Sequence, residues 1–321
     1  MGEVKDVEAA RRRAEQRASR VAAGLDDLER WLRDQVRGGL AGAEREGYAR
    51  FEQPAARLVD AQAPAAAAAV RRMPGIVASG AGWPGRLLDE LARLHLLVAA
   101  HRRLADLPPP LAATVRTWVG YPVATADVRR EPAVRDRWSV LARRDSEDEN
   151  LTTRRVWLQG ASTGRLALVL SFAAWGRELD ASLVPGTCVD ADLHYYPAAA
   201  PVRALVGERH DDPDAEPEPA SVTGGGLDDA LRSWAAALAA DPWLGSWPVV
   251  LAGVVPCPPD GGDGWRLADA AGAALPLAPV AGDPWRLLAA SGGHPVTVGG
   301  DWTPAGLVPW CVAAGDELVS L

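Results

Sequence analysis

The chain has 321 residues, of which 48% are hydrophobic, and its formal net charge at pH 7 is −8. This length is enough for two or three globular cores, because single domains cluster around roughly 100 to 150 residues, and the hydrophobic content excludes a disordered protein. No apolar run approaches the roughly 18 to 20 residues that a membrane span requires, and residues 1–16 are charged throughout, unlike a signal peptide. We therefore expect a cytoplasmic protein without a membrane partner.

Charge is distributed unevenly along the chain. Residues 1–155 contain 27 basic and 22 acidic residues, whereas residues 156–321 contain 7 basic and 20 acidic residues. The first half is patterned as helices and the second half as strands, so the sequence predicts an α+β fold. The difference in charge suggests two surfaces that meet different partners.

The N-terminal region, residues 1–125, is predicted to be helical. From about residue 3 to residue 37, apolar residues recur at alternating spacings of four and three, which is typical of a long amphipathic helix. Gly24 weakens the middle of this helix by about 1 kcal/mol.

Two further helices are expected in this region. One covers 42–62, and the other covers 84–104 with a wide leucine-rich face. The three prolines at 108–110 end the latter helix.

Residues 126–210 are predicted to form an antiparallel β-meander. After a short helical piece around 127–137, the period of the apolar residues changes from 3.6 to 2. Hairpin loops are expected at 146–150 and 160–164. The expected strands are 138–144, 152–159, 166–172 and 188–196.

Residues 211–226 are acidic and rich in proline and glycine, which predicts an exposed linker between domains. Beyond the linker, residues 227–321 are predicted to form a helix over 227–240 and a small tryptophan-rich antiparallel sheet or partial barrel. A weak internal repeat, 264–277 and 284–298, predicts two stacked hairpins in this sheet.

The sequence contains no metal or catalytic signature. Cys188, Cys257 and Cys311 are far apart and lack CxxC or CxH spacing, so we expect reduced cysteines, no zinc site and no other cofactor. The GxxxxGK[ST] and HExxH motifs are also absent, which disfavours the P-loop nucleotide-binding and zinc-protease classes. GxGxxG occurs at 80–85 and GxSxG at 160–164, but neither lies between an expected strand and an expected helix, the context that dinucleotide-binding and hydrolase sites require. We therefore expect that the protein is not an enzyme.

One group of residues on an expected strand could carry chemistry. Asp190, Asp192 and His194 project to the same face, about 7 Å apart from neighbour to neighbour, and could hold a divalent cation or act as acid and base. The residues between them are apolar, so this ridge is also what the solvent face of an ordinary strand looks like.

Tryptophans are the second group of candidates, since nine of the 13 follow residue 155. Trp265, Trp285 and Trp302 lie in the expected C-terminal sheet. They could pack in its core, line a peptide-binding groove, or stack bases or sugars; the acidic charge of this half favours core packing over nucleic-acid binding.

Arginines near the N-terminus are the third group. Arg11, Arg12 and Arg13 could contact phosphate groups, but they are interleaved with Glu8 and Glu15 on a predicted helix, which is typical of a solvated face.

A resemblance to a known family is carried by four stretches. With them, the chain resembles the long region that follows the zinc finger in bacterial, particularly actinobacterial, SWIM zinc finger family proteins. The resemblance covers most of residues 1–210 and, less closely, the tail. The four stretches are GLDDLERWLRDQVRGGLA (24–41), GWPGRLLDELARLHLL (82–97), LTTRRVWLQG (151–160) and LDASLVPGTCVDADLHYYPAAAPVRALVGERH (179–210).

In that family a CxCx(n)CxH finger lies upstream, SWIM fingers bind DNA or proteins, and the genes tend to lie beside those of a MoxR-type AAA ATPase and a von Willebrand A domain protein. The resemblance therefore implies such partners. This chain contains neither CxC nor CxH, and it begins about where the region after the finger would begin. Either its reading frame starts too late or it is a natural version without the finger, and no zinc ligand is carried over.

Two functions from different classes agree with these patterns. The first is a non-catalytic protein-interaction or scaffold protein that acts with an AAA ATPase and von Willebrand A system. The alternative is a nucleic-acid-binding accessory protein that uses the basic N-terminal helix, although the net charge of −8 disfavours phosphate binding. An enzyme built on the 190–194 ridge is a weaker third hypothesis.

Overall fold

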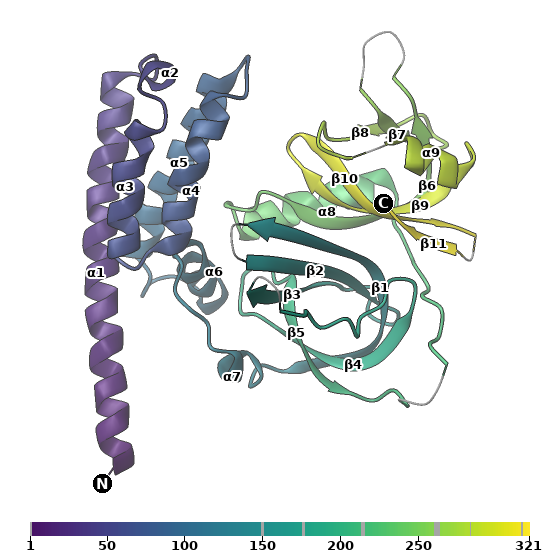
Figure 1. Cartoon of the computed structure of the whole chain (residues 1–321), viewed down its shortest axis with the longest axis horizontal. Coiled ribbons are helices and arrows are strands. Elements are labelled where there is room, and N and C mark those ends of the chain that lie inside the picture. The colour runs from purple at the N-terminus through teal and green to yellow at the C-terminus, as the bar shows by residue number, and fades with distance from the viewer. Residues whose placement is uncertain are drawn as a thin grey trace. The chain divides into compact units, whose positions relative to one another are not determined.

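The computed structural model (Figure 1) describes residues 2–148, 151–174, 177–212, 216–259, 264–282, 284–315 and 317–321. The chain divides into two compact units, Met1–Val123 and Ala124–Leu321. The first is helical, and the second combines two sheets with short helices, so the predicted α+β fold is confirmed. No helix in the described ranges is long and apolar enough to cross a membrane.

The first unit is a helical bundle. Its long first helix turns one apolar stripe towards the other helices, and Val21, Leu25 and Leu28 on this stripe are each no more than 2% exposed. The predicted long helix and the helix expected at 84–104 are both present. The helices of this unit are α1 (Gly2–Gly38), α2 (Ala43–Glu46), α3 (Ala49–Asp60), α4 (Pro64–Val77), α5 (Trp83–Arg102) and α6 (Pro109–Val119).

Three helices of the bundle differ from the expectation. The segment 42–62 is not one helix, because Gly47 ends α2 with a φ of 56° before α3 begins. The sequence analysis missed α4 and α6, although both begin with proline, which is favoured in the first turn of a helix. The prolines at 108–110 therefore start α6 as well as following α5.

The first sheet of the second unit is a closed barrel with the strand order β1-β2-β3-β5-β4. β4 pairs antiparallel with β1 and β5, and β3 pairs parallel with β5. The four expected strands are present, but the pairing is more complex than a meander, and a fifth strand was missed. The strands are β1 (Ala133–Asp148), β2 (Leu151–Gly160), β3 (Leu166–Ala174), β4 (Cys188–Tyr195) and β5 (Arg203–Arg209).

The start of β1 also corrects the expected helical piece at 127–137. Only α7 (Thr125–Val128) is helical there, and β1 begins at Ala133. The expected hairpin loop at 146–150 is also corrected, because residues 146–148 belong to β1 and pair with residues 151–153 of β2; residues 149–150 lie outside the described ranges.

The second sheet has the strand order β11-β10-β9-β6-β7-β8. Of the two expected hairpins, β7 and β8 form the first, whereas the second is wrong because residues 284–291 form the helix α9, which buries Leu287. The predicted helix at 227–240 is present as α8. The elements are α8 (Leu227–Ala240), β6 (Trp247–Cys257), β7 (Arg266–Ala268), β8 (Ala274–Pro276), α9 (Pro284–Ser291), β9 (Val296–Thr303), β10 (Gly306–Ala314) and β11 (Glu317–Ser320).

The segment expected as an exposed linker, 211–226, is hydrogen-bonded to the barrel in its described part; residues 213–215 lie outside the described ranges. Buried Gln159 donates to the Thr223 carbonyl at 2.7 Å and accepts from the Thr223 N–H at 3.0 Å. Buried Ser139 makes the same two kinds of bond with Ser221 at 2.7 and 3.0 Å. The barrel and the second sheet therefore belong to one unit.

Candidate functional site

The outer face of β4 carries the ridge that the sequence predicts. Asp190, Asp192 and His194 are partly exposed, and they alternate with residues buried in the barrel core, as expected for a strand with one solvent face. The buried residues of β4 are Val189, Ala191, Leu193 and Tyr195.

Two of the three ridge residues have other partners. Arg135 on β1 donates from Nε and Nη2 to the two carboxylate oxygens of Asp190, at 3.1 and 2.9 Å, and this pairing holds the pKa of Asp190 below its ordinary value. His194 Nδ1 lies 2.9 Å from the main-chain oxygen of Glu131, to which it donates. The predicted ridge therefore does not converge on one ligand position.

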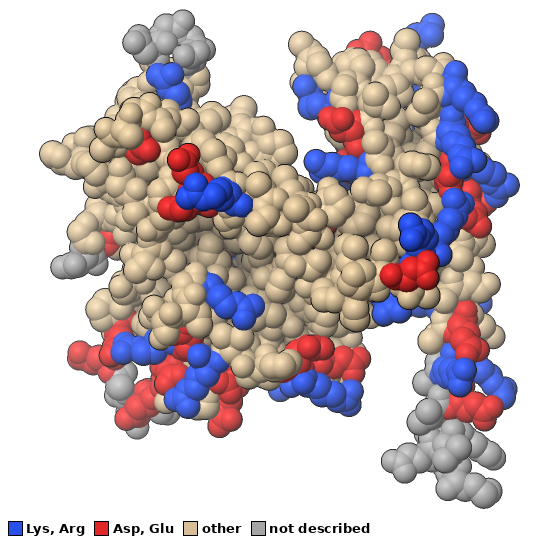
Figure 2. All heavy atoms as spheres, turned by 180° about the vertical axis from the view of Figure 1, so that it is seen from behind, with Lys and Arg blue, Asp and Glu red and all other residues tan. Residues whose placement is uncertain are grey.

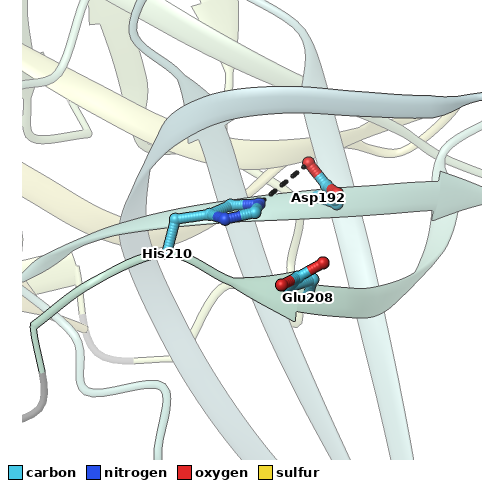
Figure 3. A group of neighbouring side chains, drawn as sticks. All are labelled: Asp192, Glu208 and His210. Carbon is cyan, nitrogen blue, oxygen red and sulfur yellow. Dashed lines mark ion pairs between the residues drawn. The ribbon is translucent and has the colours of Figure 1, made fainter.

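Asp192 instead belongs to a group that the sequence analysis did not find. Figure 3 shows it with Glu208 on β5 and His210 just after β5, and one ligand atom from each of the three side chains lies within 4.8 Å of the others. Asp192 Oδ1 and His210 Nε2 are 3.4 Å apart. We refer to Asp192, Glu208 and His210 as the barrel triad.

The geometry of the barrel triad follows from the β4–β5 pairing. Ala191 is opposite Arg209, so the neighbouring Asp192 and Glu208 lie across from each other, and His210 follows two residues after Glu208 on the same face. A register shift between Ala191 and Leu193 marks a bulge, a feature that re-aims side chains. The i, i+2 spacing of Glu208 and His210 was visible in the sequence, but β5 was not recognised as a strand.

A recess of about 610 Å³ adjoins the barrel triad. His210 of the barrel triad also lines this recess. Other lining residues are Asp190, Arg209, Glu218 and the partly exposed Cys188. Its lining combines apolar residues with side chains of both signs of charge.

The basic N-terminal residues form ion pairs within α1. Arg11 Nε lies 3.0 Å from Glu15, and an Arg12 Nη2 atom lies 2.9 Å from Glu8; Arg13 is exposed. Figure 2 shows basic and acidic side chains interleaved along the long helix, at the right of the view. This pattern is that of the solvated helix face considered above.

The candidate tryptophans do not line a common groove. Trp265 and Trp285 meet edge to face with their ring centroids 4.9 Å apart, and Trp285 is 60% exposed. Trp302 packs against the core of the second sheet. Trp265 packs against this core as well, so that of the three candidates only Trp285 is largely exposed.

An apolar groove lies between α1 and α5 of the bundle. Leu32 and Leu91 are nearly buried, whereas Val36 and Leu88 are 58% and 48% exposed. The groove has a volume of about 330 Å³. Its remaining lining residues are Arg33, Arg37, Ala92 and His95. We refer to it as the bundle groove.

A buried carboxylate lies beside the bundle groove. Glu29 on α1 is 3% exposed, and Arg33 Nη2 lies 2.5 Å from its Oε1 atom. Arg102 on α5 forms an ion pair with its Oε2 atom, and His95 Nδ1 lies 3.7 Å from Oε1. These contacts link α1 to α5 and hold Arg33 at the edge of the groove.

Comparisons with known proteins support part of the expected resemblance to SWIM zinc finger family proteins. Residues 16–119, which include most of α1 and extend to the end of α6, match the family model of the SWIM-associated four-helix bundle domain. Neither the curated proteins nor the solved structures contain a match. The residues that line the bundle groove all lie within the matched range.

Proposed function

We propose that this chain is a non-catalytic protein-interaction protein whose bundle groove binds an amphipathic helix of a partner protein. The observation that carries the proposal is the pair of exposed apolar side chains, Val36 and Leu88, above a floor formed by Leu32 and Leu91. Two helices that leave an apolar furrow between them offer a site for a third helix, which inserts side chains at i, i+3, i+4 and i+7.

Charge indicates the kind of helix that fits. Arg33 and Arg37 stand on the α1 side of the groove, and the unit Met1–Val123 contains 19 basic and 15 acidic residues. A partner helix with glutamate or aspartate along the edge that faces α1 would complement Arg37, whereas Arg33 already pairs with Glu29. We therefore propose an acidic amphipathic helix as the occupant.

The resemblance to SWIM zinc finger family proteins supplies the candidates for the partner. We propose that the helix belongs to a MoxR-type AAA ATPase or to a von Willebrand A domain protein, and that the chain acts as a scaffold for them in the cytoplasm. The acidic second unit, with 15 basic and 27 acidic residues, offers a separate surface of opposite charge.

The test uses the full chain and the purified ATPase or von Willebrand A protein from the same genome. Replacing Leu88 or Val36 with aspartate places a charge in the groove and should weaken binding about tenfold or more. Val59→Asp is the matched control, because Val59 is also exposed, at 42%, but lies on α3. Binding is measured by calorimetry, and thermal unfolding checks that the variants fold.

Two results would contradict this proposal. One is that neither protein binds the wild-type chain at micromolar concentrations. The other is that Val59→Asp weakens binding as much as Leu88→Asp does, since the groove would then not be the site.

The alternative function, nucleic-acid binding through the basic N-terminal helix, has less support. The ion pairs of Arg11 and Arg12 with acidic neighbours reduce the positive charge that phosphates would meet. This function requires an affinity for DNA or RNA that falls steeply with salt and is lost when Arg11, Arg12 and Arg13 are replaced by alanine. We expect no such binding.

A further inference from the structure

The barrel triad combines the ligand types of a metal site on one outer face of the barrel. Asp192 and Glu208 each offer a carboxylate oxygen, and His210 offers an imidazole nitrogen. Ligand atoms bound at about 2.0 to 2.2 Å to one first-row ion are separated by about 3 to 4 Å. The ligand atoms of the barrel triad lie within 4.8 Å of one another, so small side-chain rotations would bring them to these separations.

His210 provides a second, independent observation. Its Nε2 atom is buried and has no hydrogen-bond partner among the described residues. Asp192 Oδ1 lies 3.4 Å from this nitrogen but without hydrogen-bond geometry. A buried ring nitrogen normally forms a hydrogen bond or ligates a metal ion. A metal ion placed between the two carboxylates would give His210 Nε2 such a partner.

The surrounding charges favour a cation. Arg135 is committed to Asp190 through two hydrogen bonds. Because Arg135 pairs with Asp190, the barrel triad retains two carboxylates around one imidazole.

We infer that Asp192, Glu208 and His210 form a binding site for a divalent first-row metal ion, with Zn²⁺ and Mn²⁺ as the ions of choice. Two carboxylates with one imidazole suit these ions better than Ca²⁺ or Mg²⁺, which prefer sites made only of oxygen ligands. Water completes the coordination, because Asp192 and His210 retain 22% and 21% exposure of their side chains and Glu208 is exposed. The three ligands do not have the sequence spacing of zinc-finger ligands. The inference is also independent of the function proposed for the bundle groove.

The experiment uses the full chain after treatment with EDTA and dialysis. Zn²⁺ and Mn²⁺ are titrated at pH 7.5, with calorimetry for both and electron paramagnetic resonance for free Mn²⁺. We expect one ion per chain, and about tenfold or weaker affinity in Asp192→Asn, Glu208→Gln and His210→Gln. His194→Gln is the matched control, since its ring lies on the same β4 face but donates to the Glu131 carbonyl.

Thermal unfolding separates loss of the site from loss of the fold. Saturating metal should raise the Tm of the wild type and of His194→Gln, and leave the Tm of Asp192→Asn unchanged, while the metal-free proteins unfold at similar temperatures. The inference is overturned if the wild type binds no stoichiometric ion or binds only in the millimolar range. It is equally overturned if His194→Gln loses affinity together with the variants of the barrel triad.

Discussion

Trp157 on β2 and Trp310 on β10 stack with their ring centroids 5.0 Å apart and their planes inclined by 21°. Both indoles are buried, at 4% and 1% exposure. They lie in a small core that the barrel and the second sheet share, with contributions from Leu141, Ala142, Val250 and Cys311. This core joins two sheets that the sequence analysis assigned to separate domains.

Truncation of this stack should destabilise the whole second unit. Trp310→Ala removes a fully buried aromatic ring, and such changes cost about 3 to 5 kcal/mol. We expect this loss in the free energy of unfolding, measured by urea denaturation with a probe in each sheet. Trp285→Ala is the control, because that ring is 60% exposed, and its loss should cost about 1 kcal/mol. Separate unfolding transitions for barrel and second sheet in the wild type would contradict a shared core.

Elements with a local repeat of buried residues could be predicted from the sequence, whereas the pairing of distant segments could not. Helix α1 and strand β4 were predicted because their buried residues repeat at 3.6 or 2 positions, and this period is local. The pairing of β4 with β1, and of β3 with β5, depends on contacts between distant segments and leaves no local pattern. The segment 211–226 was read as a linker because its partners, Ser139 and Gln159, are polar residues of distant strands.

Gly24 shows the same limit within a single helix. Its sequence context suggests only a weak point in α1. In the structure, a Cβ atom at this position would lie 2.3 Å from the Cβ atom of Ala61, the residue that caps the end of α3. The glycine therefore allows α1 and α3 to pack closely.

We predict that Gly24→Ala destabilises the bundle although alanine has the higher helix propensity. The gain in propensity is about 1 kcal/mol, whereas overpacking costs about 1 to 3 kcal/mol. Thermal unfolding of the full chain measures the net effect. The double variant Gly24→Ala with Ala61→Gly removes the clash and should recover most of the lost stability. A more stable Gly24→Ala variant would show that the helices separate without cost.

Asp136, at the start of the barrel, is a buried carboxylate that organises the β2–β3 hairpin loop. It accepts hydrogen bonds from the N–H groups of Arg137, Ser162 and Thr163 at 2.8 to 3.0 Å, and from the Thr163 hydroxyl at 2.8 Å. Burial alone would raise the pKa of Asp136, but these hydrogen bonds outweigh it and lower the pKa below its ordinary value. The loop at 160–164, predicted as a hairpin connection, is thus tied to β1.

We predict that Asp136→Asn lowers the free energy of unfolding at pH 7 by about 1 to 3 kcal/mol, because the amide cannot accept from all four donors. Since the folded pKa is depressed, the stabilisation by Asp136 is complete above its unfolded pKa of about 3.9 and is lost as the pH falls through the folded pKa. The difference between wild type and variant should therefore shrink below about pH 4. Urea denaturation between pH 2 and 8 measures it. Asp127→Asn, which removes only an exposed ion pair with Arg130, should differ little from wild type.

The candidate metal site was half predicted for the same physical reason. Asp192 was singled out because alternation along β4 placed it on an outer face. The residues that complete the barrel triad, Glu208 and His210, come from β5, whose register against β4 is set by a bulge. A single strand can reveal a ridge, but the convergence of ligands requires knowledge of the neighbouring strand.

The three cysteines should differ in reactivity, and this difference reports on the shared core. Cys311 is fully buried beside Trp310, and burial raises the pKa of its thiol to about 12, whereas Cys188 and Cys257 are partly exposed. Because the thiolate is the reactive form, the raised pKa and the burial of Cys311 both protect it from alkylation. We expect iodoacetamide to modify Cys188 and Cys257 in the folded chain and Cys311 only after unfolding, as followed by peptide mass spectrometry.

The variant Trp310→Ala makes this prediction specific to the packing between the sheets. Loss of the indole opens a cavity next to Cys311, so the thiol should be modified in the folded variant faster than in the wild type. Trp285→Ala, which leaves the shared core intact, should protect Cys311 as well as the wild type does. If Cys311 in the wild type reacts as fast as Cys188, the core shared by the barrel and the second sheet does not protect the thiol in solution, which would contradict the prediction.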